Sequence, residues 1–143
     1  MDLFNISLIN MRQAIREYTE KNIEPEKLAE IIKVYFTEEG FVTQSAKSPS
    51  GSVVQARKGG FFRTILAMDR AFTVTIEGTS ADFKVKVGVS KWLKDLGIAA
   101  LEVLFITPLV VFVEVPEALW SFELEHRLWH YIEDQIEPGI ASS

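Results

Sequence analysis

The chain has 143 residues, of which 48% are hydrophobic and 24% charged, and its formal net charge is −5. This length and balance fit one globular domain with its own core and argue against disorder along the whole chain. Because the chain has no cysteine, disulfides, thiolate metal sites and cysteine nucleophiles are excluded.

The first ten residues, MDLFNISLIN, carry neither a basic n-region nor the small-residue cleavage site of a secretory signal. They predict an unprocessed, cytoplasmic protein. Apolar residues then recur at helical spacing between Ile9 and Asn22, so we expect a first helix there. A second helix is predicted from Pro25, which suits a first turn, to a stop at Gly40.

The middle of the chain has the alternation of β-strands. Residues 41–47 and 52–58 flank the turn sequence SPSG, and residues 72–77 and 83–89 flank GTSAD. Each pair is expected to form a hairpin, the second with one buried and one wet face. Between the hairpins, GGFFRTILAMD fits either a short helix or an irregular connection.

These elements predict an α+β, two-layer fold. Its four-stranded antiparallel sheet would consist of the two hairpins, with N-terminal and C-terminal helices packed on one face. The domain is expected to span residues 1–137, and residues 138–143 to form a flexible tail.

The most apolar stretch is LGIAALEVLFITPLVVFVEV, residues 96–115. A membrane-spanning helix needs about 20 apolar residues, whereas Glu102 and Pro108 interrupt this run. We therefore expect a helix over residues 91–106 that packs on the sheet, and either helix or strand over 109–115. The residues expected on the sheet side of this helix are Trp92, Leu96, Ala99, Ala100, Val103, Phe105 and Ile106. A helix that is apolar on all sides must be buried on all sides, and one small domain has too little surface to bury it completely. The remainder would be buried by a second copy of the chain, by another protein or by a lipid surface.

Several segments together resemble a group of small, uncharacterised prokaryotic proteins. They are VVQARKGG (53–60), DRAFTVTIE (69–77), VKVGVSKWL (85–93) and TPL (107–109), followed by a final helix. The resemblance covers residues 25–137 and implies a helical, apolar segment after Trp92. It implies no activity and no catalytic residue. Relatives tend to have Gly and Ala in that segment, whereas this chain has Leu101, Glu102, Val103, Glu114 and Pro116, which favours a packed helix.

The favoured function is a non-enzymatic interaction or assembly module that binds itself or a protein partner through residues 96–115. The predicted partner-binding residues are Trp92, Leu104, Phe105, Leu109, Phe112 and Trp120.

A second prediction concerns charge, which is distributed unevenly. Residues 41–94 hold nine basic and three acidic side chains, and residues 95–143 hold one basic and nine acidic. The two regions either neutralise each other, within the fold or across a homodimer, or attract charged partners. An anionic membrane or a nucleic acid would be bound by Arg57, Lys58, Arg63, Arg70, Lys84 and Lys86. The acidic net charge argues against nucleic acid and leaves peripheral membrane association as the alternative.

The third prediction is a metal site or enzyme built on the final helix. His126 and His130 are one helical turn apart, a spacing that can chelate zinc or nickel, with Glu133 as a possible third ligand. The competing interpretation is a solvated acidic face, and we expect no metal and no cofactor. No residue set indicates a small-molecule substrate.

Overall fold

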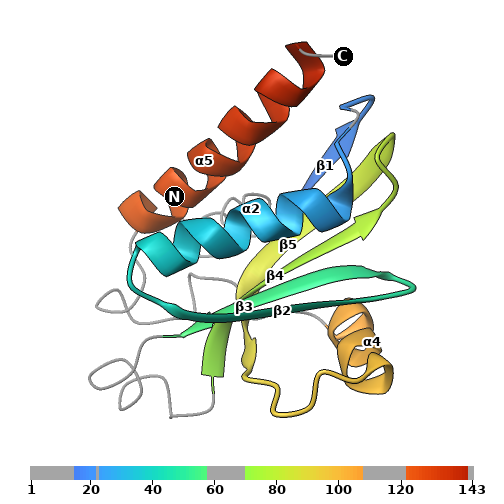
Figure 1. Ribbon diagram of the computed structural model, residues 1–143, viewed down its shortest axis with the longest axis vertical. Helices are drawn as coiled ribbons and strands as arrows, with labels where there is room; N and C mark the ends of the chain where they lie inside the picture. Colours follow the sequence, from blue (N-terminus) through green and yellow to red (C-terminus); the bar gives the residue numbers. More distant parts are fainter. Residues whose placement is uncertain (1–14, 22, 58–69, 108–121, 142–143) are drawn as a thin grey trace, which may run out of the picture.

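The computed structural model describes residues 15–21, 23–57, 70–107 and 122–141 (Figure 1). Five strands form one sheet in the order β1-β5-β4-β3-β2, and all neighbours are antiparallel. The strands are β1 (Ile15–Thr19), β2 (Val42–Ser48), β3 (Gly51–Arg57), β4 (Arg70–Gly78) and β5 (Asp82–Lys91). The helices are α2 (Pro25–Glu38), α4 (Ile98–Ile106) and α5 (Phe122–Ala141). The α+β class and both hairpins are therefore confirmed.

Both hairpins depend on glycine where the strands meet. Gly51 begins β3 with a φ of 154°, and Gly78 ends β4 with a φ of 123°. A Cβ atom at Gly51 would lie 2.1 Å from the carbonyl oxygen of Ile76, and one at Gly78 would lie 2.3 Å from that of Asp82. Only glycine combines these backbone angles with such close approach.

The prediction of a helix over residues 9–22 is wrong for residues 15–19, which form β1. This strand pairs with β5, with Ile15 opposite Lys86 and Tyr18 opposite Phe83. Side chains alternate along it, so that Tyr18 is buried and its neighbours Glu17 and Thr19 are exposed. Backbone pairing with the edge of β5 outweighs the local helical spacing, and the sheet has five strands instead of four.

One face of the sheet forms the main core beneath α2 and α5. The described residues of α2 that are buried there include Leu28, Ile32 and Phe36. From α5, Leu128, Trp129, Ile132 and Ile136 are buried in the same cluster. The strands contribute the alternate residues of their sequences, which are Val54, Ala56, Phe72, Val74, Ile76, Phe83, Val85, Val87 and Val89. The amphipathic pattern predicted for α2 is thus confirmed.

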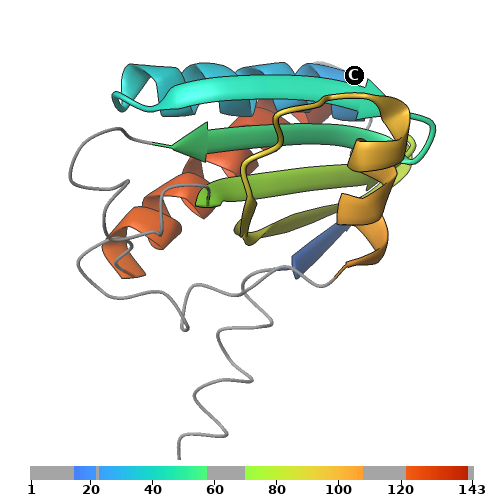
Figure 2. The ribbon, with the colours of Figure 1, turned by 90° about the horizontal axis from the view of Figure 1, so that it is seen from below.

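The expectation that all helices lie on one face is wrong. Figure 2 shows α4 on one side of the sheet, with α2 and α5 on the other. Leu101, Leu104 and Phe105 of α4 form a second cluster with Val53. Because an apolar helix cannot remain in water, it covers the face that the second hairpin was expected to leave wet. Thr73 and Thr75 on that face are completely buried.

The buried amide of Gln55 fixes the connection that leads from β5 to α4. This side chain is 1% exposed. It donates to the carbonyl oxygen of Lys91 at 2.8 Å and accepts from the backbone N–H of Leu93 at 2.9 Å. Gln44 donates to both the Gln55 amide oxygen and the Leu93 carbonyl oxygen, each at 2.9 Å. Because this network holds residues 91–93 in an extended path, α4 begins at Ile98 and not at Lys91 as predicted.

The Gln55→Ala variant is expected to lose about 2–3 kcal/mol in free energy of unfolding, because it leaves buried groups of the connection without partners. Urea denaturation followed by circular dichroism measures this loss. Gln135→Ala is the control, since Gln135 has no hydrogen bond to the described residues and is partly exposed. Equal stability of the two variants would contradict the role assigned to Gln55.

Candidate functional site

The outward face of α4 is an exposed apolar surface. Leu101, Leu104 and Phe105 point toward the sheet and are buried. On other sides of the helix, Ile106 is 83% exposed, Ile98 59% and Val103 52%. With Ala99, which is also exposed, these residues define what we name the α4 surface. Glu102 lies one turn from both Ile98 and Ile106, with its carboxylate bonded to Ser48 and Ser50. Water meets hydrocarbon over the rest of this side of the helix.

The one charged residue of α4 has a structural role. Glu102 accepts hydrogen bonds from the Ser48 hydroxyl, from the Ser50 hydroxyl at 2.6 Å and from the Ser50 backbone N–H at 3.2 Å. The hydrogen bonds from Ser48 and Ser50 lower the pKa of this carboxyl group below its ordinary value. At the C-terminal end of the helix, the Lys86 ammonium donates to the carbonyl oxygen of Phe105 at 3.3 Å. Polar contacts thus hold the middle and the C-terminal end of α4 to the sheet.

None of the predicted partner-binding residues that the structure describes belongs to the α4 surface. Leu104 and Phe105 are buried against the sheet and are only 5% and 9% exposed. Trp92 is half-buried beneath the Arg57 guanidinium, 4.1 Å from the ring centroid. Leu109, Phe112 and Trp120 lie outside the described residues.

Val103 and Ile106 were expected on the sheet side of α4, and the structure corrects this. Helical geometry sets both residues away from Leu101 and Leu104. The signal missed in the sequence was Glu102, whose turn partners fix the rotation of the helix.

The predicted anion-binding residues do not gather on one surface among those described. Arg57 stacks on Trp92, Lys84 forms an ion pair with Glu77 at 3.1 Å, and Lys86 binds the end of α4. For Arg70 only the backbone is described, paired with Lys91. Lys58 and Arg63 lie outside the described residues, as does the whole of GGFFRTILAMD (59–69). Anion binding by this set stays a prediction.

The weak metal candidates separate into two groups. His126 and His130 are exposed on α5 with ring centroids 6.2 Å apart, and His130 pairs with Asp134 at 3.6 Å. Glu133 instead accepts from the Arg16 guanidinium at 2.9 Å and from the Tyr18 hydroxyl at 3.0 Å. It therefore ties α5 to β1. Within the described ranges, no three His, Cys, Asp or Glu side chains are grouped as metal ligands.

The pKa of Tyr18 reflects its contact with Glu133. Burial raises the pKa of the Tyr18 hydroxyl, and the neighbouring Glu133 carboxylate raises it further. Arg16 also stacks on Trp129, 4.4 Å from the ring centroid.

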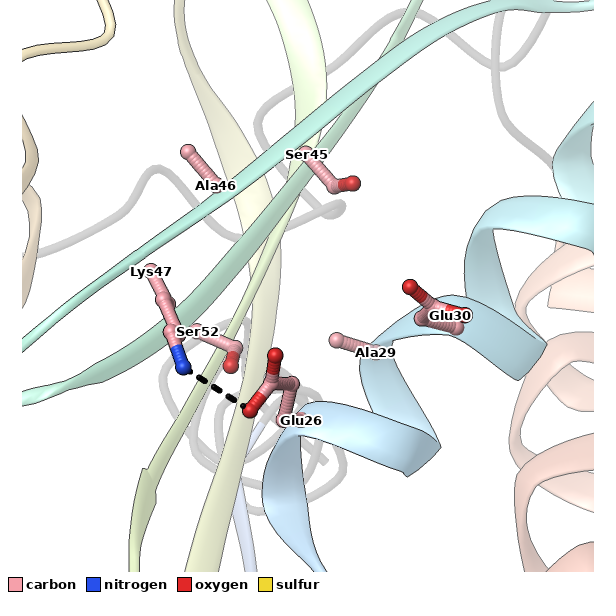
Figure 3. Close-up of a pocket in the computed structure, with 7 residues that line it drawn as sticks. All are labelled: Glu26, Ala29, Glu30, Ser45, Ala46, Lys47 and Ser52. Carbon is pink, nitrogen blue, oxygen red and sulfur yellow. Dashed lines mark hydrogen bonds and ion pairs between the residues drawn. The ribbon is translucent and has the colours of Figure 1, made fainter.

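A polar cavity that the sequence did not predict lies between α2 and the β2–β3 hairpin (Figure 3). Its volume is about 200 Å³. The lining residues are Glu26, Ala29 and Glu30 of α2, Ser45, Ala46 and Lys47 of β2, and Ser52 of β3. No signal in the sequence indicated it, because these residues come together only where α2 crosses the hairpin.

Comparisons of the chain with models of protein families, with curated proteins and with solved structures gave no match. The resemblance to a group of small prokaryotic proteins stays a prediction. In the part of the chain that the structure describes, no helix is long and apolar enough to cross a membrane.

The hydrogen bonds to Glu102 predict a pH dependence in the docking of α4. The pKa of Glu102 is lower in the folded chain than in the unfolded chain, where its ordinary value is 4.5. Its contribution to stability is therefore complete above pH 4.5 and is lost as pH falls through the folded-state pKa. In a carbon-13 NMR titration, the Glu102 carboxyl resonance should titrate below pH 4.5.

Combined Ser48→Ala and Ser50→Ala substitutions should move that midpoint up toward 4.5. Ser45→Ala is the matched control, because this serine lies on the same strand without contacting Glu102. A midpoint at the ordinary value in the unaltered chain would refute the assigned contact.

Proposed function

We propose that this protein is an assembly module that binds a second copy of itself through the α4 surface. The observation that supports this most strongly is the 83% exposure of Ile106 on a helix whose opposite side is buried in the fold. Exposed contiguous hydrocarbon of this kind is typical of interaction surfaces.

The chemistry of the surface favours a second copy over a charged partner. A twofold axis brings the same patch of two subunits together, so the patch must complement itself. The exposed Ile, Val and Ala side chains meet this requirement. The one carboxylate beside them, that of Glu102, is bonded to the Ser48 and Ser50 hydroxyls of its own chain. Burial of each Ile or Val contributes about 1.5–3 kcal/mol, which must offset the entropy of association. We therefore expect a weak dimer when α4 alone forms the interface.

The position of Ile15 supports a surface that extends beyond the helix. Ile15 is 44% exposed and lies opposite Lys86 in the sheet. Because Lys86 reaches the carbonyl oxygen of Phe105, Ile15 belongs to the same end of the sheet face as Ile106. Hydrocarbon from β1 would thus add to that of α4.

The other functions gain no comparable support from the described residues. The cations Arg57, Lys84 and Lys86 already have partners, which weakens the case for an anionic membrane or nucleic acid surface. Among the described residues, no group of three His, Cys, Asp or Glu side chains could hold a metal ion, so His126 and His130 gain no support as ligands.

The Ile106→Glu variant is expected to shift the protein to a monomer, because a carboxylate cannot be buried against the same surface of a second copy. Sedimentation velocity over a concentration series measures the change. Val103→Glu should act in the same direction.

Val34→Glu is the matched control, since Val34 is 51% exposed on α2, across the sheet from α4. It should leave the association unchanged. An unaltered chain that stays monomeric at all concentrations, or equal association of Ile106→Glu and unaltered chain, would disprove the proposed assembly.

A further inference from the structure

The cavity between α2 and the hairpin has the features of a ligand site. It lies on the face of the sheet that carries α2, whereas α4 covers the other face (Figures 2 and 3). A second hollow of about 330 Å³ continues past the start of α2 and shares Glu26, Lys47 and Ser52 with the first. The two form one groove along the β2–β3 hairpin.

The cavity exists because small side chains face each other where large ones would close the layer. Elsewhere on α2, Leu28, Ile32 and Phe36 fill the space above the sheet. At the cavity only Ala29 faces the strands, and Figure 3 shows its methyl group with Glu26 on one side and Glu30 on the other. A space lined by hydroxyl and carboxylate groups holds polar occupants, because bare polar groups are costly without partners.

Ser52 is the most informative residue of the lining. It is 4% exposed, yet its hydroxyl has no hydrogen bond to the described residues. The hydroxyl borders the cavity and can therefore bond to an occupant. Ser45 has no side-chain hydrogen bond to the described residues either, and in Figure 3 its hydroxyl is directed to the side where α2 lies.

The charge of the lining selects a cation. Glu26 and Glu30 are one helical turn apart and both face the cavity. Lys47 pairs with Glu26 at 3.1 Å, which leaves Glu30 without a cation among the described residues. The side chains of Lys47 and Glu26 are 66% and 58% exposed, so their pair is a weak surface pair that a ligand can displace.

We propose that this cavity binds a guanidinium group. The acceptors are spread over two sides of the cavity, with carboxylates on α2 and hydroxyls on β2 and β3. A planar guanidinium directs five N–H donors outward in a fixed arrangement and pairs with carboxylates through two parallel hydrogen bonds. An ammonium group concentrates its three donors on one atom, and an anion would be repelled by Glu30.

The guanidinium can belong to a free small molecule or to an arginine of a bound peptide. The second source is structurally possible because β2 is the last strand of the sheet, and an extended segment can add to an outer strand. The chemistry of recognition is the same for both, so the experiment includes both.

The test is a titration of the full chain, followed by the backbone amide resonances of residues 26–30 and 45–52 in nitrogen-15 NMR spectra. The probes are methylguanidinium, methylammonium and a blocked five-residue peptide with one central arginine. We expect saturable shifts with methylguanidinium and binding about tenfold weaker for methylammonium. Tighter binding of the peptide would assign the source to a polypeptide, and equal binding would assign it to a small molecule.

Three variants locate the site. Glu30→Gln should weaken methylguanidinium binding about tenfold, since the unpaired charge is lost. Ser52→Ala should weaken it by a smaller factor, and Ala29→Met should abolish it by filling the space. Glu38→Gln, on the same helix but outside the cavity, is the matched control and should bind like the unaltered chain.

Absence of saturable shifts with any probe would overturn the proposal. So would equal binding by Glu30→Gln and Glu38→Gln in folded protein, which thermal unfolding of each variant verifies. Because the α4 surface lies across the sheet, the association of Ile106→Glu is independent of these results. Failure of one proposal therefore leaves the other intact.

Discussion

The arrangement of the whole molecule depends on one buried amide, that of Gln55. The chain leaves β5 at an edge of the helix-covered core and must cross to the opposite face of the sheet before α4 begins. Gln55 makes this possible because it accepts from the backbone N–H of Leu93 and donates to the carbonyl oxygen of Lys91, where β5 ends. Without these bonds, half-buried backbone groups at the start of the connection would lack partners within the chain. This anchor sets the path toward α4, and Glu102 then fixes the rotation of the helix that exposes Ile106.

The two candidate surfaces divide the molecule between two kinds of recognition. The α4 surface is hydrocarbon and suits association that depends on burial. The cavity beside α2 is polar and suits recognition through charge and hydrogen bonds. Since the sheet separates them, occupation of one does not block the other. Part of the excess of basic residues in the middle of the chain is engaged in contacts within the fold. Lys84 pairs with Glu77, Lys86 donates to the carbonyl oxygen of Phe105, and Arg57 stacks on Trp92.

The sequence predicted the elements with strong periodicity and missed those fixed by distant contacts. The two hairpins and α2 were recoverable because alternation or an apolar stripe extends over many residues there. Strand β1 was not, since five residues are too few to show a period of two against the helical spacing of Ile15 and Tyr18. The placement of α4 opposite the other helices was equally hidden, because a helix apolar on all sides carries no sign of which side is buried.

The candidate sites show the same limit. Segment 96–115 was predicted to be an interaction region. Leu104 and Phe105 were chosen within it for their size, whereas exposure depends on the rotation that Glu102 fixes. The cavity could not be foreseen, because Glu26, Ser45 and Ser52 come together only when α2 crosses the hairpin.

The two hairpin glycines give this fold a recognisable mark. Gly51 and Gly78 lie in adjacent strands at the same end of the sheet, where Gly51 is opposite Glu77. At both positions a neighbouring carbonyl oxygen occupies the space that any side chain would need. Other residues of the sheet can be exchanged for ones of similar shape, but these two cannot. A distant homologue that has lost all other similarity should therefore still keep this glycine pair, one at the start of β3 and one at the end of β4.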